Sequence, residues 1–292
     1  MAKKNIELVL SPPEPHFVGD GFRVHNFIPG GYRADMERMN PFIMLDYGAK
    51  FNFPPSDHPL GVGVHPHRGF ETVTIAYKGR IAHHDSAGNS GEIGEGDVQW
   101  MTAASGILHK EYHEKEFSKK GGEMQMVQLW VNLPAQFKMS KPKYQSLTND
   151  QISKFELVSD GGIVEIIAGE YMGQKGSAST FSPVNLLNLK LNKNAKADFS
   201  FPAQYNTALL VIEGKITVNS NEEVPADHFA IFQNEGEDFE IQTDRGAIVL
   251  VMSAETINEP IASHGPFVMN TRQEILQAFD DYHKGKFGFL AD

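Results

Sequence analysis

Short hydrophobic runs separated by glycine- and proline-containing turns form the main pattern along this chain. The 292 residues include 27 glycines and 16 prolines, which interrupt the runs at short intervals. Runs of this length between such residues favour strands joined by turns over helices. The pattern therefore predicts an all-β fold, with strands over residues 42–46, 71–77, 125–132, 164–167, 186–191, 207–212, 230–232 and 247–252.

The clearest helical pattern lies near the C-terminus. Thr271 precedes Glu274 by three residues, which is the spacing of a capping box at a helix start. Ile275 and Phe279 follow four residues apart and so share one face of a helix. We expect a short C-terminal helix over residues 271–283.

An internal repeat indicates that the fold is duplicated. Residues 71–81 align with residues 206–216, and Gly79 falls on Gly214. The chain is also long enough for two domains of ordinary size, roughly 100–200 residues each. We therefore predict two related β-barrels, with an N-terminal barrel over residues 1–135, a linker over 136–150, and a C-terminal barrel with the helix over 151–292.

Composition and charge exclude several classes of function. Acidic residues outnumber basic ones by 37 to 26, and a net charge of −11 repels nucleic-acid phosphates, so we expect no direct nucleic-acid partner. The absence of cysteine excludes disulfides, thiolate metal sites and cysteine nucleophiles. Neither a secretory signal nor a run of roughly 18 apolar residues is present. We expect no membrane partner and a cytoplasmic location, or a nuclear one in a eukaryote.

Two pairs of metal-binding side chains lie in the predicted first barrel. His65 and His67 are two residues apart, so on a strand both imidazoles point to one face. His109 and Glu111 repeat this spacing just after Gly106. If the two strands face each other inside a barrel, all four donors reach one ion at roughly 2.0–2.2 Å. Either pair alone is also typical of a polar turn or an exposed strand, but both together favour a metal site.

The spacing leaves the carboxylate ligand open. Glu71 lies four residues after His67 and shares its parity, so it competes with Glu111 for this role. His83 lies in a polar stretch that we expect to form a loop. His113 has the parity of Glu111 and is a candidate either for the rim of the site or for a group that supports the metal ligands.

Longer motifs extend this interpretation across the chain. The HPHRGFETV run, the GEGDVQWMTAASGILHKE run and the HGPFVMNTRQEI run together resemble the pirin family of the cupin superfamily. The resemblance implies two stacked cupin-type, jelly-roll barrels, with one non-haem iron in the N-terminal barrel. It implies that the metal ligands are His65, His67, His109 and Glu111, and so favours Glu111 over Glu71.

The sequence also departs from the usual cupin pattern. Pro59 stands where cupins have a glycine, six residues before the first histidine. Under the repeat alignment, Ser200, Pro202 and Asp244 replace the three histidines in the second barrel. We therefore expect no set of metal ligands there.

The metal and the activity follow from this donor set and the resemblance. Three imidazoles and one carboxylate suit Fe(II), while Ni, Co, Mn, Cu and Zn are alternative divalent ions. The resemblance implies a quercetin 2,3-dioxygenase, which cleaves flavonols with O₂ and releases carbon monoxide. Glu111 is then the expected catalytic base for the flavonol hydroxyl. The side chains expected to line a mouth for a small aromatic substrate are Phe42, Met44, Phe51, Phe53 and Trp100.

A regulatory protein without turnover is the alternative to this enzyme. The resemblance also implies that the oxidation state of the iron can alter the surface of the protein and its affinity for a protein partner. Such a protein would act as a transcriptional co-regulator or as a modulator of a metabolic enzyme. An acidic surface permits contact with a basic protein partner. We favour the enzyme because the donor set leaves coordination positions open for a substrate.

Overall fold

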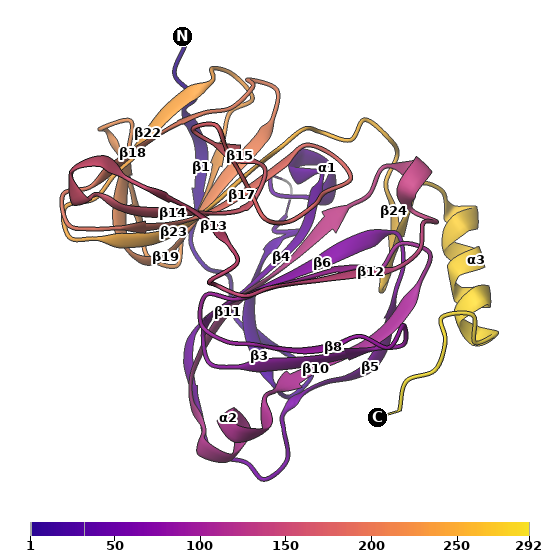
Figure 1. The fold of residues 1–292 in the computed structure, drawn as a ribbon. Coiled ribbons are helices and arrows are strands. Elements are labelled where there is room, and N and C mark those ends of the chain that lie inside the picture. Colours follow the sequence, from indigo (N-terminus) through magenta and orange to yellow (C-terminus); the bar gives the residue numbers. More distant parts are fainter. Residues whose placement is uncertain (1, 32, 292) are drawn as a thin grey trace. The chain divides into compact units, whose positions relative to one another are not determined.

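All the predicted strands and the C-terminal helix are present in the computed structural model, which describes residues 2–31 and 33–291 (Figure 1). The chain forms two compact units. We call Pro13–Asn149 with residues 257–291 the first barrel unit. Residues 2–12 with Asp150–Thr256 form the second barrel unit.

The first barrel unit contains two larger sheets. Its strands are β2 (His16–Val18), β3 (Phe22–Ile28), β4 (Phe42–Phe53), β5 (Gly61–His67), β6 (Phe70–Lys78), β7 (Ile81–Asp85), β8 (Ser90–Ile93), β9 (Val98–Thr102), β10 (Ile107–His113), β11 (Gly122–Asn132), β12 (Lys143–Leu147), β24 (Ala262–His264) and β25 (Phe267–Met269). Short helical segments are α1 (Met36–Met39), α2 (Lys115–Lys120) and η1 (Ala135–Phe137). One sheet has the order β12-β9-β6-β11-β4-β3-β2, and the other has the order β5-β10-β7-β8.

The second barrel unit repeats this arrangement. Its elements are β1 (Ile6–Leu10), β13 (Ser153–Glu156), η2 (Val158–Asp160), β14 (Gly162–Ala168), β15 (Glu170–Tyr171), β16 (Gln174–Lys175), β17 (Val184–Leu191), β18 (Lys196–Ser200), β19 (Asn206–Val218), β20 (Glu222–Pro225), β21 (Phe229–Phe232), β22 (Asp238–Gln242) and β23 (Ala247–Ala254). Apart from the edge strand, its main sheet runs β21-β19-β23-β17-β14-β13, the same chain order as β9-β6-β11-β4-β3-β2. The repeat seen in the sequence thus places β6 and β19 at equivalent positions.

The edge strands cross the predicted domain boundaries. The sequence predicts contiguous domains over residues 1–135 and 151–292, with a linker over 136–150. Instead β1 pairs with β21 in the second barrel unit, and β12 pairs with β9 in the first. An edge strand has unpaired backbone groups that another strand can satisfy. Residues 143–147 are therefore a strand of the first barrel unit and not part of a linker.

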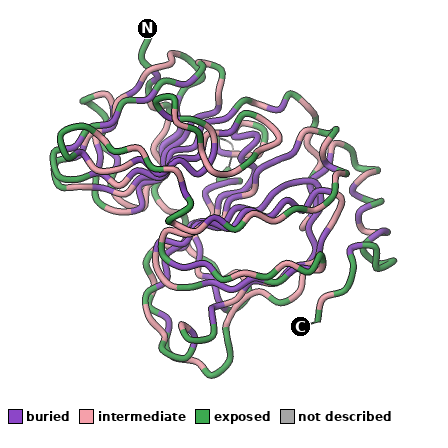
Figure 2. Tube along the Cα trace, in the orientation of Figure 1, coloured by how far each residue is buried: buried purple, intermediate pink, exposed green. Residues whose placement is uncertain are grey.

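Buried positions follow the strands in both units, as Figure 2 shows. The second barrel unit encloses a continuous apolar cluster that includes Phe199, Val211 and Phe239. In the first barrel unit, β6 instead buries the polar side chain of Thr74, at the position where the repeat alignment places the apolar Leu209 of β19. A buried polar side chain needs a hydrogen-bond partner, so this difference indicates where the chemistry lies.

The C-terminal helix α3 (Arg272–His283) begins as predicted. Thr271 accepts a hydrogen bond from the backbone N–H of Glu274, whose carboxylate accepts one from the backbone N–H of Thr271. Its inner face packs Ile275 and Ala278 against Phe267 of β25. Within the described residues, no helix combines the length and the apolar character needed to cross a membrane.

Candidate metal centre

Two neighbouring strands carry the four predicted ligands. His65 and His67 end β5, and His109 and Glu111 lie on β10, where buried and half-buried positions alternate. The strands pair antiparallel, with His65 opposite His109. The donors therefore lie side by side in one sheet, and the expectation that their strands face each other across the barrel is wrong.

The three imidazoles converge. Their candidate ligand nitrogens all lie within 4.8 Å of one another. The ring of His109 has its centroid 4.2 Å from that of His65 and 4.7 Å from that of His67. Nitrogens at about 2.0–2.1 Å from a common ion would lie within this spacing. The three side chains thus fit one divalent metal ion.

Hydrogen bonds prepare two of these rings for a metal. Nδ1 of His65 lies 2.8 Å from the carbonyl oxygen of Gly63, and Nδ1 of His67 lies 3.4 Å from that of Pro266. A carbonyl oxygen only accepts, so each Nδ1 carries a proton, and Nε2 is the ring nitrogen left to face a metal. Donation from the second ring nitrogen is the usual way to orient a metal-binding histidine.

The electrostatic surroundings keep the buried rings neutral. Burial, reinforced by the neighbouring His65, holds the pKa of His67 well below its usual range. Burial also holds the pKa of His109 well below its usual range, with the other imidazoles adding to the effect. Nε2 of His109 is buried and has no hydrogen-bond partner among the described residues. A neutral ring with an unsatisfied buried nitrogen is the state that a metal ion satisfies.

Glu111 is held by side chains from the larger sheet. Nε2 of Gln128 on β11 donates to its Oε2 at 2.8 Å, and Nε2 of Gln99 on β9 donates to its Oε1 at 3.3 Å. The Thr74 hydroxyl on β6 lies 3.1 Å from the same Oε1 and 2.6 Å from Oε1 of Gln128. Thr74 pairs with Gln128 and Gln99 in the register of the sheet. This polar row fixes the orientation of the carboxylate.

The ligand atoms form two overlapping groups. His65, His67 and His109 make one group, and His83, His109 and Glu111 make another within the same 4.8 Å limit. Glu111 therefore lies close to His109, but it does not belong to the group that contains His65 and His67. Both groups share His109, which places the carboxylate at the edge of the three-imidazole cluster.

His83 is the residue that the sequence interpretation placed wrongly. It lies on β7 and is fully buried, with Nδ1 3.5 Å from Nδ1 of His109 and 3.2 Å from Nε2 of Gln99. Its ring stacks on Tyr144 of β12 at 5.2 Å. The alternation of β7 points it inward beside its exposed neighbour His84. His83 thus supports His109 from the side away from β5.

Two other candidates lie away from the cluster. Glu71 is buried and its Oε1 accepts a hydrogen bond from the Thr102 hydroxyl at 2.7 Å, and it belongs to neither ligand group. His113 is buried against phenyl rings, with Nε2 2.7 Å from the carbonyl oxygen of Gly21. His113 is therefore a core residue and not part of the rim.

A cavity of about 320 Å³ opens beside the cluster. His65, His67 and Glu111 lie on its wall. Of the five side chains expected to line a mouth, Met44 does so, whereas Phe42 and Trp100 are fully buried in the core. The remaining lining residues are Val18, Phe22, Val24, Asp46, Val62, Met126, Gln128 and Trp130. Most of these side chains are apolar, which suits an aromatic ligand.

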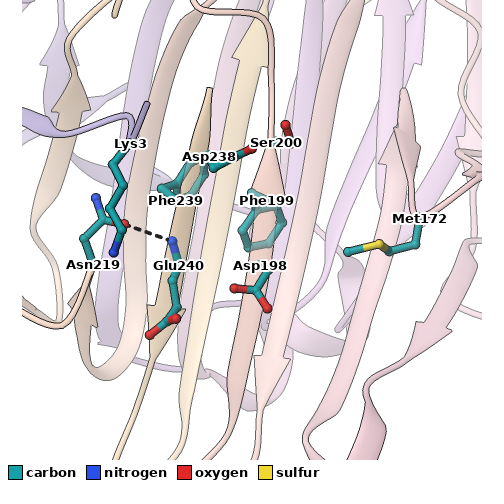
Figure 3. A pocket seen from close by; sticks show the side chains of 9 residues that line it. All are labelled: Lys3, Met172, Asp198, Phe199, Ser200, Asn219, Asp238, Phe239 and Glu240. Carbon is teal, nitrogen blue, oxygen red and sulfur yellow. Dashed lines mark hydrogen bonds between the residues drawn. The ribbon is translucent and has the colours of Figure 1, made fainter. Parts of the chain in front are cut away.

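The second barrel unit has a different surface at the equivalent strands. β18 and β22 hold the places in chain order of β5 and β10, and they pair Ser200 with Asp238. The pocket beside them is lined by carboxylates and phenyl rings, with no imidazole among the residues drawn in Figure 3. Asp244, which the repeat alignment puts in place of His109, lies instead in an exposed turn after β22. Loops of unequal length cause this shift in alignment.

Comparison with known proteins decides the family. A model described as Pirin matches residues 21–131, and one described as Pirin C-terminal cupin domain matches residues 186–288. A tomato (Solanum lycopersicum) protein named "Pirin-like protein" is 39% identical over 274 residues, which cover 93% of this chain and 89% of that protein. The chain belongs to the pirin family.

Two further relatives of this pirin carry enzyme names. A Pseudomonas aeruginosa protein named "Putative quercetin 2,3-dioxygenase" is 43% identical over 272 residues, which cover 93% of this chain and 94% of that protein. A crystal structure of quercetin 2,3-dioxygenase from Acinetobacter baumannii is 44% identical, with a TM-score of 0.93, covering 99% of this chain and 100% of the other. In this pirin, the histidine and glutamate cluster can hold a divalent metal beside a mostly apolar cavity.

Proposed function

We propose that this pirin is a quercetin 2,3-dioxygenase, which cleaves a flavonol with O₂ and releases carbon monoxide. The observation that supports it most is the convergence of three imidazoles, of which burial keeps His67 and His109 neutral, beside an apolar cavity that also contains a carboxylate. The relatives named as quercetin 2,3-dioxygenases are 43% and 44% identical to the chain. The proposed substrate is therefore a small aromatic molecule.

The proposed metal ligands are His65, His67, His109 and Glu111. Three nitrogen donors and one oxygen donor suit Fe(II), and Ni, Co, Mn, Cu or Zn could occupy the same donors. When bound, the metal would act as a Lewis acid that lowers the pKa of a coordinated hydroxyl and brings O₂ chemistry to the site.

The residues of the chain would prepare the substrate for that chemistry. The apolar wall would exclude water and hold the flavonol rings, so that electrostatic interactions inside the cavity become stronger. Glu111 would accept the proton of the flavonol hydroxyl. The hydrogen bond from Gln128 would keep the carboxylate of Glu111 oriented toward that proton. The fixed orientation provided by the polar row removes the need to reorganise this base during the reaction.

The test is turnover of quercetin by iron-loaded protein in air. We expect loss of flavonol absorbance with release of one carbon monoxide per flavonol. Glu111→Gln keeps a side chain of the same size and should lower kcat by about 10²-fold or more, as expected for the loss of a general base. A Glu111→Gln variant with full metal content and full activity would show that this residue is not the base. No turnover with any of the six metals would favour the regulatory alternative.

A further inference from the structure

The cavity beside the metal cluster has few polar groups of its own. Apart from the proposed ligands, its lining contains two polar side chains, Asp46 on β4 and Gln128 on β11. These residues lie opposite each other in the register of the sheet. Met44 precedes Asp46 by two residues and therefore shares its face of β4. Asp46 thus places a carboxyl group on an otherwise apolar wall.

Gln128 is fully used within the protein. Its Nε2 donates to Glu111, and its Oε1 lies 2.6 Å from the hydroxyl of Thr74. Both ends of the amide therefore serve the orientation of Glu111. Gln128 has little left to offer a ligand, and Asp46 is the polar group of the wall that is still able to bind one.

Asp46 is oriented but incompletely satisfied. Nδ2 of Asn26 donates to its Oδ1 at 2.7 Å and also donates to the carbonyl oxygen of Ile28 at 2.9 Å. Among the described residues, nothing donates a hydrogen bond to Oδ2 of Asp46. Burial raises the pKa of Asp46, which reflects the loss of solvation around its carboxylate. A ligand that brings a hydroxyl group to Oδ2 would replace this lost solvation.

From this arrangement we propose that Asp46 is a specificity-determining residue, which accepts a hydrogen bond from a flavonol hydroxyl other than the one that Glu111 deprotonates. The inference rests on the proposed function and adds the substrate class, namely flavonols with several hydroxyl groups. A carboxylate acceptor in an apolar wall discriminates strongly, because a ligand without the hydroxyl leaves the carboxylate unpaired. The metal cluster would fix one end of the substrate, and Asp46 would select a hydroxyl elsewhere on it.

The experiment compares the binding of two flavonols to the metal-loaded full chain without O₂. Quercetin carries five hydroxyl groups, whereas 3-hydroxyflavone carries only the hydroxyl expected to meet the metal and Glu111. Binding is followed by quenching of tryptophan fluorescence, because Trp130 lines the cavity. The wild type should bind quercetin more tightly. Asp46→Ala should weaken quercetin binding by about 10-fold to 100-fold and change 3-hydroxyflavone binding by less than about threefold.

Two further variants keep the result interpretable. Asp46→Asn has nearly the same size, so it tests the carboxylate without opening space and should lose part of the preference. Met44→Leu alters the same wall without a polar change and should retain the preference. Circular dichroism and metal analysis establish that each variant is folded and loaded.

The possible failures are distinct. If the wild type binds both flavonols and Asp46→Ala keeps the quercetin preference, the role of Asp46 is overturned while the proposed function stands. An equal loss for both flavonols also overturns it, because a general disturbance of the cavity would then explain the effect. If the wild type binds neither flavonol, the proposed function fails, and the role of Asp46 fails with it.

Discussion

Two buried glutamates of the first barrel unit have different surroundings. Glu111 has amide donors on both carboxylate oxygens, whereas Glu71 accepts a hydrogen bond from the hydroxyl of Thr102. Burial raises the pKa of Glu71 to about 7, despite the opposing hydrogen bonds and the charge of Lys143. Glu71 is therefore a structural carboxyl group that the fold holds more easily in its protonated form.

This environment predicts a pH-dependent effect of Glu71→Gln on stability. The pKa of Glu71 in the folded protein is above its value of about 4.3 in the unfolded chain. The contribution of protonated Glu71 to the stability of the fold is therefore complete below about pH 4.3 and is lost as the pH rises through 7. At pH 8 the neutral variant should exceed the wild type in free energy of unfolding by up to about 3 kcal/mol. Near pH 4 the two should agree. Urea unfolding at both pH values checks this, and exposed Glu123→Gln is the control.

Local spacing was enough to predict the imidazoles of the site. The parity of His65 with His67, and of His109 with Glu111, depends only on the strand period. The side chains that orient Glu111 depend on cross-strand register, which no local pattern contains. A signal was nevertheless present, because Thr74 interrupts a run of strand-forming apolar residues and Gln128 interrupts another. A polar residue inside such a run indicates a buried hydrogen-bond partner.

At the scale of elements, the C-terminal segment of the first barrel unit supports both ligand strands. The carbonyl oxygen of Pro266 contacts His67, and Asp281 of α3 pairs with Arg68 at 2.9 Å. Gly106 precedes β10 with φ +125°, and a Cβ there would lie 2.4 Å from the ring of Phe287. The C-terminal segment therefore packs against Arg68, which follows the ligand pair of β5, and against Gly106, which precedes the ligand pair of β10.

The buried ion pair gives a prediction at this scale. Asp281→Ala leaves the guanidinium of Arg68 buried without its carboxylate, which should lower the free energy of unfolding by about 3 kcal/mol. It should also weaken metal binding through the neighbouring His67. Asp280→Ala removes an exposed partner of Lys284 on the same helix and should change stability by less than about 1 kcal/mol. Equal effects of the two substitutions in urea unfolding would contradict this account.

Elements with a strong local pattern were predicted, and those defined by pairing were not. The capping box of α3 and the apolar strands β6, β11, β17 and β23 have their pattern within the segment itself. β12 was taken for a linker because the segment around it mixes proline, lysine and polar residues without a steady period. In the structure only Leu147 among its five residues is buried. Its existence depends on backbone pairing with β9, which is remote in the sequence.

At the scale of the whole molecule, the main sheets of the two units share the order of six strands, and each has one further strand at its edge. This edge strand is β12 in the first barrel unit and β1 in the second. β1 comes from the start of the chain and completes the sheet of the second barrel unit. Lys4 adds hydrogen bonds to the carbonyl oxygens of Ala203 and Gln233, and Ile6 and Val9 pack on the apolar cluster of that unit. The duplication thus explains the two sheets but not the origin of their edges.

Removal of the residues before Pro13 tests this arrangement. Amide protons of β21 should exchange faster with solvent, because their hydrogen-bond acceptors on β1 are gone. Exchange in β9, which pairs with β12 in the first barrel unit, should stay as in the full chain. Hydrogen exchange followed by mass spectrometry measures both segments in one experiment. Unchanged protection of β21 would show that β1 does not complete its sheet in solution.

Metal analysis of freshly purified protein tests the central claim most directly. We expect about one divalent ion per chain in the wild type and the loss of most of it in His109→Ala, with an unchanged circular dichroism spectrum. His113→Ala is the matched control, because His113 lies on the same strand and face but contacts Gly21 and phenyl rings instead. It should keep the ion. Full metal content in folded His109→Ala, or no metal in the wild type after incubation with Fe(II), would contradict the account.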